Sequence, residues 1–140
     1  MTASERILGC DYGGRRTGLA VSDPTGTIAF PLGVVEADTP REAARRVARV
    51  AAEQQAAEIL VGLPLLPSGE RGAQVAATEE FTARLAEVFP GPIRSWDERL
   101  TTAQSERAVR EMGGAHGRKG RVDEVAATLL LQSYLDSRRA

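Results

Sequence analysis

The chain has 140 residues, 42% of them hydrophobic and 26% charged, which fits one folded domain rather than a disordered chain. Its 18 basic residues are balanced by 19 acidic residues, for a formal net charge of -1. This balance argues against a protein that holds nucleic acid through bulk positive charge alone, so any site for a polyanion must be local.

Three strands are predicted in the opening third of the chain. Between Arg6 and Asp11 the residues are apolar or small, which is typical of a strand covered on both faces. Turn-forming residues follow, and two more strands are expected over 17–22 and 27–35. Pro31 places the third strand at an edge of the sheet or at a bulge, because proline cannot donate a ladder hydrogen bond.

Helices and strands alternate in the rest of the chain. Thr39 and Pro40 predict a helix start, as N-cap and first helical residue. Thr101 and Gln104 have the spacing of a capping box. The expected elements are a helix over 40–55, a strand over 58–63, a loop over 64–72, a helix over 73–88, a strand over 92–96, a helix over 101–112, a glycine-rich basic loop over 114–120 and a helix over 122–137. This order predicts an α/β fold, one domain over 1–140, with a mixed five-stranded sheet whose first three strands form an antiparallel meander and with helices on both faces.

Acidic side chains close two of the predicted strands and begin the last helix: Asp11, the adjacent pair Asp97 and Glu98, and Asp123. Each has an ordinary structural interpretation, as a turn residue, a solvated or arginine-paired loop residue, and a partner of the helix dipole. Together, however, they could reach one cleft, where carboxylates would repel each other unless a divalent cation lay between them. Because carboxylate oxygens suit Mg²⁺ or Mn²⁺, we expect three acids, one from each of these three places, to bind one of these metals and to act in phosphodiester hydrolysis.

Basic residues lie within five positions of each of these acids. The candidate nucleic-acid-binding residues are Arg15, Arg16, Arg99, Arg118, Lys119 and Arg121. Surface arginines often only keep a protein soluble. Clustered beside carboxylates, they also suit a phosphate backbone, which arginine can bind through two hydrogen bonds.

Four segments together resemble the YqgF family of bacterial proteins, which are also described as Holliday-junction-resolvase-like proteins or candidate pre-16S rRNA nucleases. The resemblance covers nearly the whole chain, with the segments in the right order. The segments are Gly9-Cys10-Asp11-Tyr12-Gly13 with Arg16-Thr17-Gly18, Val61-Gly62-Leu63-Pro64, Asp97-Glu98-Arg99-Leu100-Thr101-Thr102, and Lys119 with Val122-Asp123-Glu124-Val125-Ala126-Ala127.

The resemblance implies a ribonuclease-H-like fold and divalent-metal nuclease chemistry, with carboxylates at the positions of Asp11, Glu98 and Asp123. In the related RuvC-type resolvases, one catalytic acid lies at the end of the fourth strand. Here the corresponding segment around Gly62 has no acid, so Glu98, from the fifth strand, must take that place if the site is complete.

The leading hypothesis is therefore a metal-dependent endonuclease that processes the 5' end of precursor 16S rRNA during ribosome biogenesis. A Holliday junction resolvase acting on branched DNA is the alternative, and a noncatalytic RNA-binding assembly factor is the second. An actin-like or sugar-kinase-like phosphotransferase is a third, although such enzymes need two domains of this kind. A monomer or a weak homodimer is expected.

Cellular location is predicted from absent features. No apolar run approaches the roughly 20 residues of a membrane span, and the N-terminus has no signal-peptide core. The single cysteine, Cys10, cannot form an internal disulfide. We therefore expect no membrane association and a location in the reducing cytoplasm.

Overall fold

The computed structural model describes residues 6–111 and 121–139, which form a five-stranded sheet of order β3-β2-β1-β4-β5. The strands are β1 (Ile7–Tyr12), β2 (Arg16–Ser22), β3 (Ala29–Glu36), β4 (Glu58–Leu63) and β5 (Ile93–Asp97). The first three strands pair antiparallel, whereas β4 pairs parallel to β1 and β5 parallel to β4. The predicted meander and mixed sheet are therefore confirmed.

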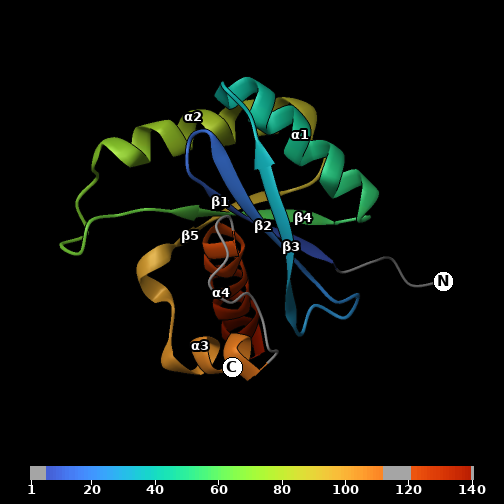
Figure 1. Cartoon of the computed structure of the whole chain (residues 1–140), viewed down its shortest axis with the longest axis vertical. Coiled ribbons are helices and arrows are strands. Elements are labelled where there is room, and N and C mark those ends of the chain that lie inside the picture. The colour runs from blue at the N-terminus through green and yellow to red at the C-terminus, as the bar shows by residue number, and fades with distance from the viewer. Residues whose placement is uncertain (1–5, 112–120, 140) are drawn as a thin grey trace.

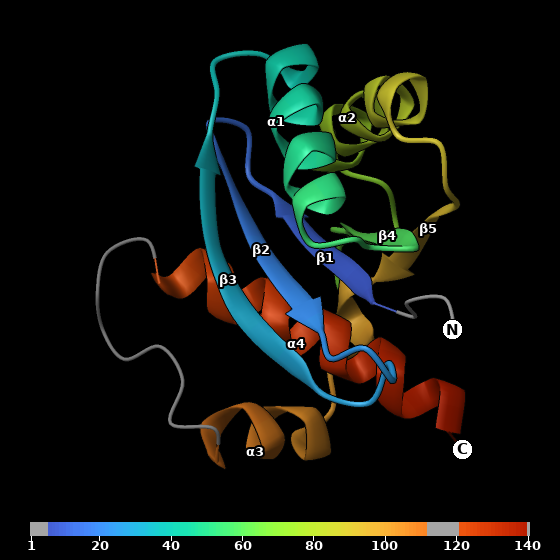
Figure 2. The same cartoon turned by 90° about the vertical axis from the view of Figure 1, so that its right-hand side faces the viewer.

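Helices cover both faces of this sheet, as expected (Figures 1 and 2). Helices α1 (Pro40–Glu53) and α2 (Ala73–Val88) lie on one face, and α4 (Arg121–Arg139) lies on the other, with α3 (Ala103–Glu111) packed against it. The apolar side chains of the strands alternate between two cores. One core joins β-strand residues such as Leu8 and Ile59 to α1 and α2, and the other joins Ile7 and Leu60 to α4.

The edge position of β3 confirms the interpretation of Pro31. Strand β3 borders only β2 in the sheet, and the β2–β3 register shifts between Leu19 and Ala20. The start of α1 also follows the prediction, because the Thr39 hydroxyl accepts a hydrogen bond from the Glu42 N–H at 3.1 Å. None of the described helices is long and apolar enough to cross a membrane.

The capping box at the start of α3 is one residue later than predicted. Residues 98–100 form a short 3-10 helix directly after β5, which delays the α-helix. Thr102, not Thr101, caps α3, because the Ser105 N–H donates to the Thr102 hydroxyl at 3.1 Å and the Thr102 N–H donates to the Ser105 hydroxyl at 3.0 Å. The Thr101 hydroxyl instead donates to the Glu98 carbonyl at 2.8 Å. The predicted loop over 114–120 lies outside the described residues.

Candidate active site

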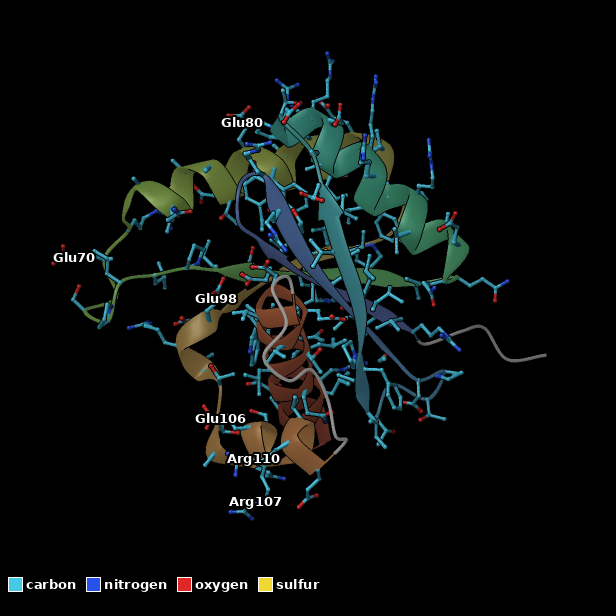
Figure 3. All side chains as sticks on the ribbon, viewed as in Figure 1. Glu70, Glu80, Glu98, Glu106, Arg107 and Arg110 are labelled. Carbon is cyan, nitrogen blue, oxygen red and sulfur yellow. The ribbon has the colours of Figure 1, made fainter. Side chains whose placement is uncertain are left out.

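Two of the three candidate carboxylates meet on the α4 face of the sheet. Residues on either side of Asp11 in β1 pack toward α1 and α2, so strand alternation points Asp11 toward α4. Glu98 is the first residue of the 3-10 helix after β5, and its side chain is half-buried, as is that of Asp11 (Figure 3). The two carboxyl groups lie within hydrogen-bonding reach of each other, with Glu98 placed to donate to Asp11 when it is protonated. Each carboxyl group therefore affects the protonation of the other.

Burial and mutual repulsion oppose the ionisation of both members of this pair. Burial raises the pKa of Glu98 to about 7, and the charge of Asp11 and its hydrogen bond to Glu98 act in the same direction. Burial also raises the pKa of Asp11, as does the charge of Asp123, while the hydrogen bond from Glu98 opposes that rise. Near neutral pH the pair therefore resists carrying two negative charges, which is the electrostatic condition that a bound cation would relieve.

A glycine in β4 makes room for Glu98. A Cβ atom on Gly62 would lie 2.8 Å from the Glu98 carboxylate and 3.0 Å from a methyl group of Leu130. Such contacts are closer than packed side chains adopt, so the glycine lets Glu98 lie over β4. Glu98 thus occupies space above the fourth strand although it belongs to the chain after the fifth. The structure therefore has room for Glu98 to take the place of the fourth-strand acid, as the resemblance requires.

A second glycine brings the start of α4 onto β2. Gly18 pairs with Asp11 across the β1–β2 ladder, and a Cβ atom there would overlap the backbone carbonyl of Asp123. The helix that carries Asp123 can therefore approach the sheet directly opposite Asp11. Sequence reasoning assigned no role to Gly18 or Gly62. The available signal was a glycine inside an otherwise apolar strand, which often marks a close approach of another segment.

Asp123 lies near the pair but has a different partner. Its Oδ2 atom forms an ion pair with the Nε atom of Arg16 at 3.2 Å, and 35% of its side chain is exposed. Its charge acts on Asp11. Among residues 6–111 and 121–139, no three acidic, histidine or cysteine side chains are arranged closely enough to hold one metal ion. Asp11 and Glu98 are in contact, whereas Asp123 is adjacent and held by arginine.

The predicted basic residues differ in how they are held. Arg15, at the β1–β2 turn, has an 86% exposed side chain, 3.8 Å from Asp38. The Arg99 guanidinium donates to both carboxylate oxygens of Asp97, including a 2.7 Å bond, and to the Pro67 carbonyl at 3.3 Å. These bonds tie the end of β5 to the loop after β4. They also lower the pKa of Asp97.

The side chains of three further candidate nucleic-acid-binding residues lie outside the described part of the chain. Arg118 and Lys119 lie outside the described residues. Arg121 is the first residue of α4, and its side chain also lies outside the described part of the chain. Their contribution to nucleic-acid binding stays a prediction.

Residues 5–137 match the family model described as "RuvX: Holliday junction resolvase". The chain belongs to this family. A protein of Chloroflexus aggregans is 43% identical over 136 residues, covering 96% of both chains, and one of Protochlamydia amoebophila is 41% identical over 141 residues, covering 95% of this chain and 94% of the other. Both are named "Putative pre-16S rRNA nuclease". The resemblance found in the sequence is thereby confirmed.

Solved structures of resolvases share the fold of this RuvX-family chain. The Thermus thermophilus RuvC structure with a Holliday junction substrate superposes with a TM-score of 0.66 at 17% identity, covering 96% of both chains. The fowlpox virus resolvase with junction DNA gives a TM-score of 0.58 at 14% identity, covering 96% of this chain and 99% of that one. These likenesses confirm the ribonuclease-H-like fold.

Without divalent metal, we expect this RuvX-family protein to lose stability as the pH rises from 5 to 8. The folded state raises the pKa of Glu98 from 4.5 to about 7, so it binds more protons than the unfolded chain in that window. Stability therefore decreases as Glu98 ionises beside Asp11. Thermal unfolding in a metal chelator should show that Glu98→Gln gives a flatter pH profile than the wild type.

Glu70→Gln is the matched control for this measurement, because Glu70 is exposed and lies away from Glu98 (Figure 3). The control should keep the wild-type slope. Identical profiles for Glu98→Gln and the wild type would contradict the raised pKa of Glu98.

Proposed function

We propose that this chain is a metal-dependent endonuclease that hydrolyses phosphodiester bonds in processing the 5' end of precursor 16S rRNA. The observation that carries the proposal is the hydrogen-bonded pair of Asp11 and Glu98, with Asp123 beside it, at the end of the sheet. Two relatives match at 43% and 41% identity over nearly their full length, and their names support RNA as the substrate. A location in the cytoplasm is part of the same proposal.

The residues fit Mg²⁺ or Mn²⁺. Asp11 and Glu98 offer oxygen atoms whose charges repel each other when both groups are ionised, and such hard oxygen donors suit these cations. Asp11, Glu98 and Asp123 would hold the metal, for which the Asp123 side chain has to leave Arg16. When bound, the metal would supply a Lewis acid for the phosphate and lower the pKa of a water molecule.

The protein's own groups have separate roles in this proposal. Asp11 and Glu98 would both act as anionic ligands once Glu98 has lost its proton to solvent. Arg16, freed from Asp123, becomes available to a substrate phosphate next to the site. Arg99 stays paired with Asp97 and holds the loop after β4 through its bond to the Pro67 carbonyl. Arg15, Arg118, Lys119 and Arg121 extend the phosphate-binding surface.

Branched DNA is the second candidate substrate. The family description names Holliday junction resolvase, and two similar folds were solved with junction DNA. Symmetric cleavage of a junction would require two copies of the chain, whereas cleavage of one rRNA strand requires one. A monomer or a weak homodimer is compatible with rRNA as the substrate. A stable dimer would favour junction DNA as the substrate.

The deciding experiment incubates purified protein and Mn²⁺ or Mg²⁺ with precursor 16S rRNA and with a four-way DNA junction in parallel. We expect cleavage near the 5' end of the rRNA, loss of that cleavage in Glu98→Gln, and no symmetric cuts in the junction. Symmetric junction cleavage with intact rRNA would establish the resolvase alternative. Binding of rRNA with no cleavage of either substrate would favour a noncatalytic assembly factor. Cleavage that survives Glu98→Gln would reject the assigned site.

A further inference from the structure

Helix α1 presents a row of arginines that the proposed active site does not use. Arg41, Arg45 and Arg49 recur every four residues and are all exposed. Residues four apart lie on one face of a helix, about 6 Å apart along its axis. Nitrogen-tipped side chains stand out from the outer face of α1 in Figure 3. The three arginines are called the α1 row below.

The α1 row differs from most other arginines because its charges have no acidic partner in the described part of the chain. Ion pairs there engage Arg15, Arg16, Arg46, Arg71, Arg84, Arg94 and Arg99. Like charges four residues apart destabilise a helix, so the row carries a small cost that a bound anion would remove. It is therefore a local positive site in a protein whose total charge is -1.

A groove runs between this row and the edge of the sheet. It has a volume of about 460 Å³ and is lined by Val35, Glu42, Arg45, Arg46, Arg49 and Val50. Glu42 is paired with Arg46 at 3.3 Å, which leaves Arg45 and Arg49 as the unpaired charges of the groove. Two valines supply apolar surface beside them. Guanidinium groups next to apolar surface suit a nucleic-acid strand, which has phosphates on one side and sugars and bases on the other.

The α1 row begins at the active-site end of the molecule. Strand β3 runs in the same direction as β1, so the residues after β3 lie at the end of the sheet that carries Asp11 (Figure 2). The Ala37 N–H donates to the Arg15 carbonyl at 3.0 Å, which ties the segment before α1 to the β1–β2 turn. Arg15 on that turn and Arg16 at the start of β2 therefore connect the site, on one face of the sheet, with the helix on the other.

We propose that the α1 row binds the phosphate backbone of a single RNA strand that continues beyond the cleavage site, over the β1–β2 turn and along α1. The proposal rests on the proposed nuclease function and adds the path of the substrate to it. A single strand fits better than a duplex, because the row is linear and the strand must bend around the end of the sheet. Charge complementarity with the unpaired arginines supplies the attraction.

The test compares two double variants in a metal chelator, where no cleavage interferes with binding. One variant is Arg45→Gln with Arg49→Gln. The control is Arg107→Gln with Arg110→Gln, which removes two exposed arginines of α3, at the opposite end of the molecule from α1 (Figure 3). Fluorescence anisotropy would measure binding of labelled single-stranded RNAs of about four and about sixteen nucleotides, the range of lengths that single-strand-binding domains cover.

For the long RNA, we expect the α1 variant to bind about tenfold more weakly at 0.15 M salt and its salt slope to fall by about 1.4, because each phosphate contact on a single strand contributes about 0.7. The short RNA and the α3 control should bind as the wild type does. An equal loss in both double variants, or the same loss on the short RNA, would overturn the proposal. Tighter binding of DNA of the same sequence, with the same loss in the α1 variant, would overturn the assignment to RNA.

Cleavage of the short RNA with Mn²⁺ separates this proposal from the proposed function. The α1 variant should cut the short RNA at the wild-type rate and the long RNA more slowly at low substrate concentration. One outcome is that the wild type cuts neither RNA while the α1 variant still loses binding to the long RNA. In that case the nuclease function fails, and the proposal that the α1 row binds RNA stands. If the wild type cuts and the α1 variant binds and cuts normally, only the binding path fails.

Discussion

Asp11→Asn is expected to abolish metal-dependent cleavage and to raise the melting temperature of the protein in a metal chelator. The amide keeps the shape of the carboxylate but removes a charge that lies against Glu98 and near Asp123. Loss of an anionic metal ligand should lower the cleavage rate by at least about 10³-fold, or about 4 kcal/mol in activation free energy. The stability gain follows because the folded state no longer brings that charge close to two other carboxylates.

The measurement pairs a single-turnover cleavage assay with a thermal unfolding curve for the same protein sample. Asp38→Asn is the matched control, because Asp38 is an exposed aspartate whose nearest arginine, Arg15, lies 3.8 Å away. The control should cleave at the wild-type rate and melt at nearly the same temperature. Loss of cleavage together with a lower melting temperature for Asp11→Asn would mean that Asp11 stabilises the fold instead of serving as a metal ligand.

The fold was largely predictable because strand and helix signals in this chain are local. Every expected helix and strand agrees with the structure to within two residues at each end, where both ends are described. Strand β4 is the clearest case, since its apolar residues lie between Glu58 and Pro64. The start of α3 was missed because Thr101 and Thr102 both suit a cap, and the 3-10 helix after β5 decides between them.

The active site was predictable only in part. The acids at the ends of β1 and β5 were found because a charge at the end of an apolar strand is conspicuous in the sequence. The contact of Asp11 with Glu98, and the ion pair of Asp123 with Arg16, depend on the distances between elements far apart in the chain. No local pattern encodes those distances, so the sequence could not distinguish a carboxylate pair with a neighbour from three equivalent ligands.

Gly18→Ala is expected to destabilise the protein by about 3 kcal/mol or more. The added methyl group would overlap the Asp123 carbonyl, which is backbone at the start of α4 and cannot move aside as the end of a side chain can. The first turn of α4 would have to separate from β2, which breaks the packing of the helix that covers one face of the sheet. Chemical denaturation monitored by circular dichroism would measure the loss, and metal-dependent cleavage should fall with it.

Gly62→Ala distinguishes this explanation from a general intolerance of alanine in the sheet. Its methyl group would meet the Glu98 carboxylate and a methyl group of Leu130, both ends of flexible side chains. We expect a smaller loss of stability than for Gly18→Ala, about 1 kcal/mol, but a strong loss of cleavage because Glu98 is pushed from its position over β4. Equal stability losses for the two variants would contradict the direct contact of α4 with Gly18. Normal cleavage by Gly62→Ala would show that Glu98 need not lie over β4 to act, and would weaken its assignment as the acid that replaces a fourth-strand carboxylate.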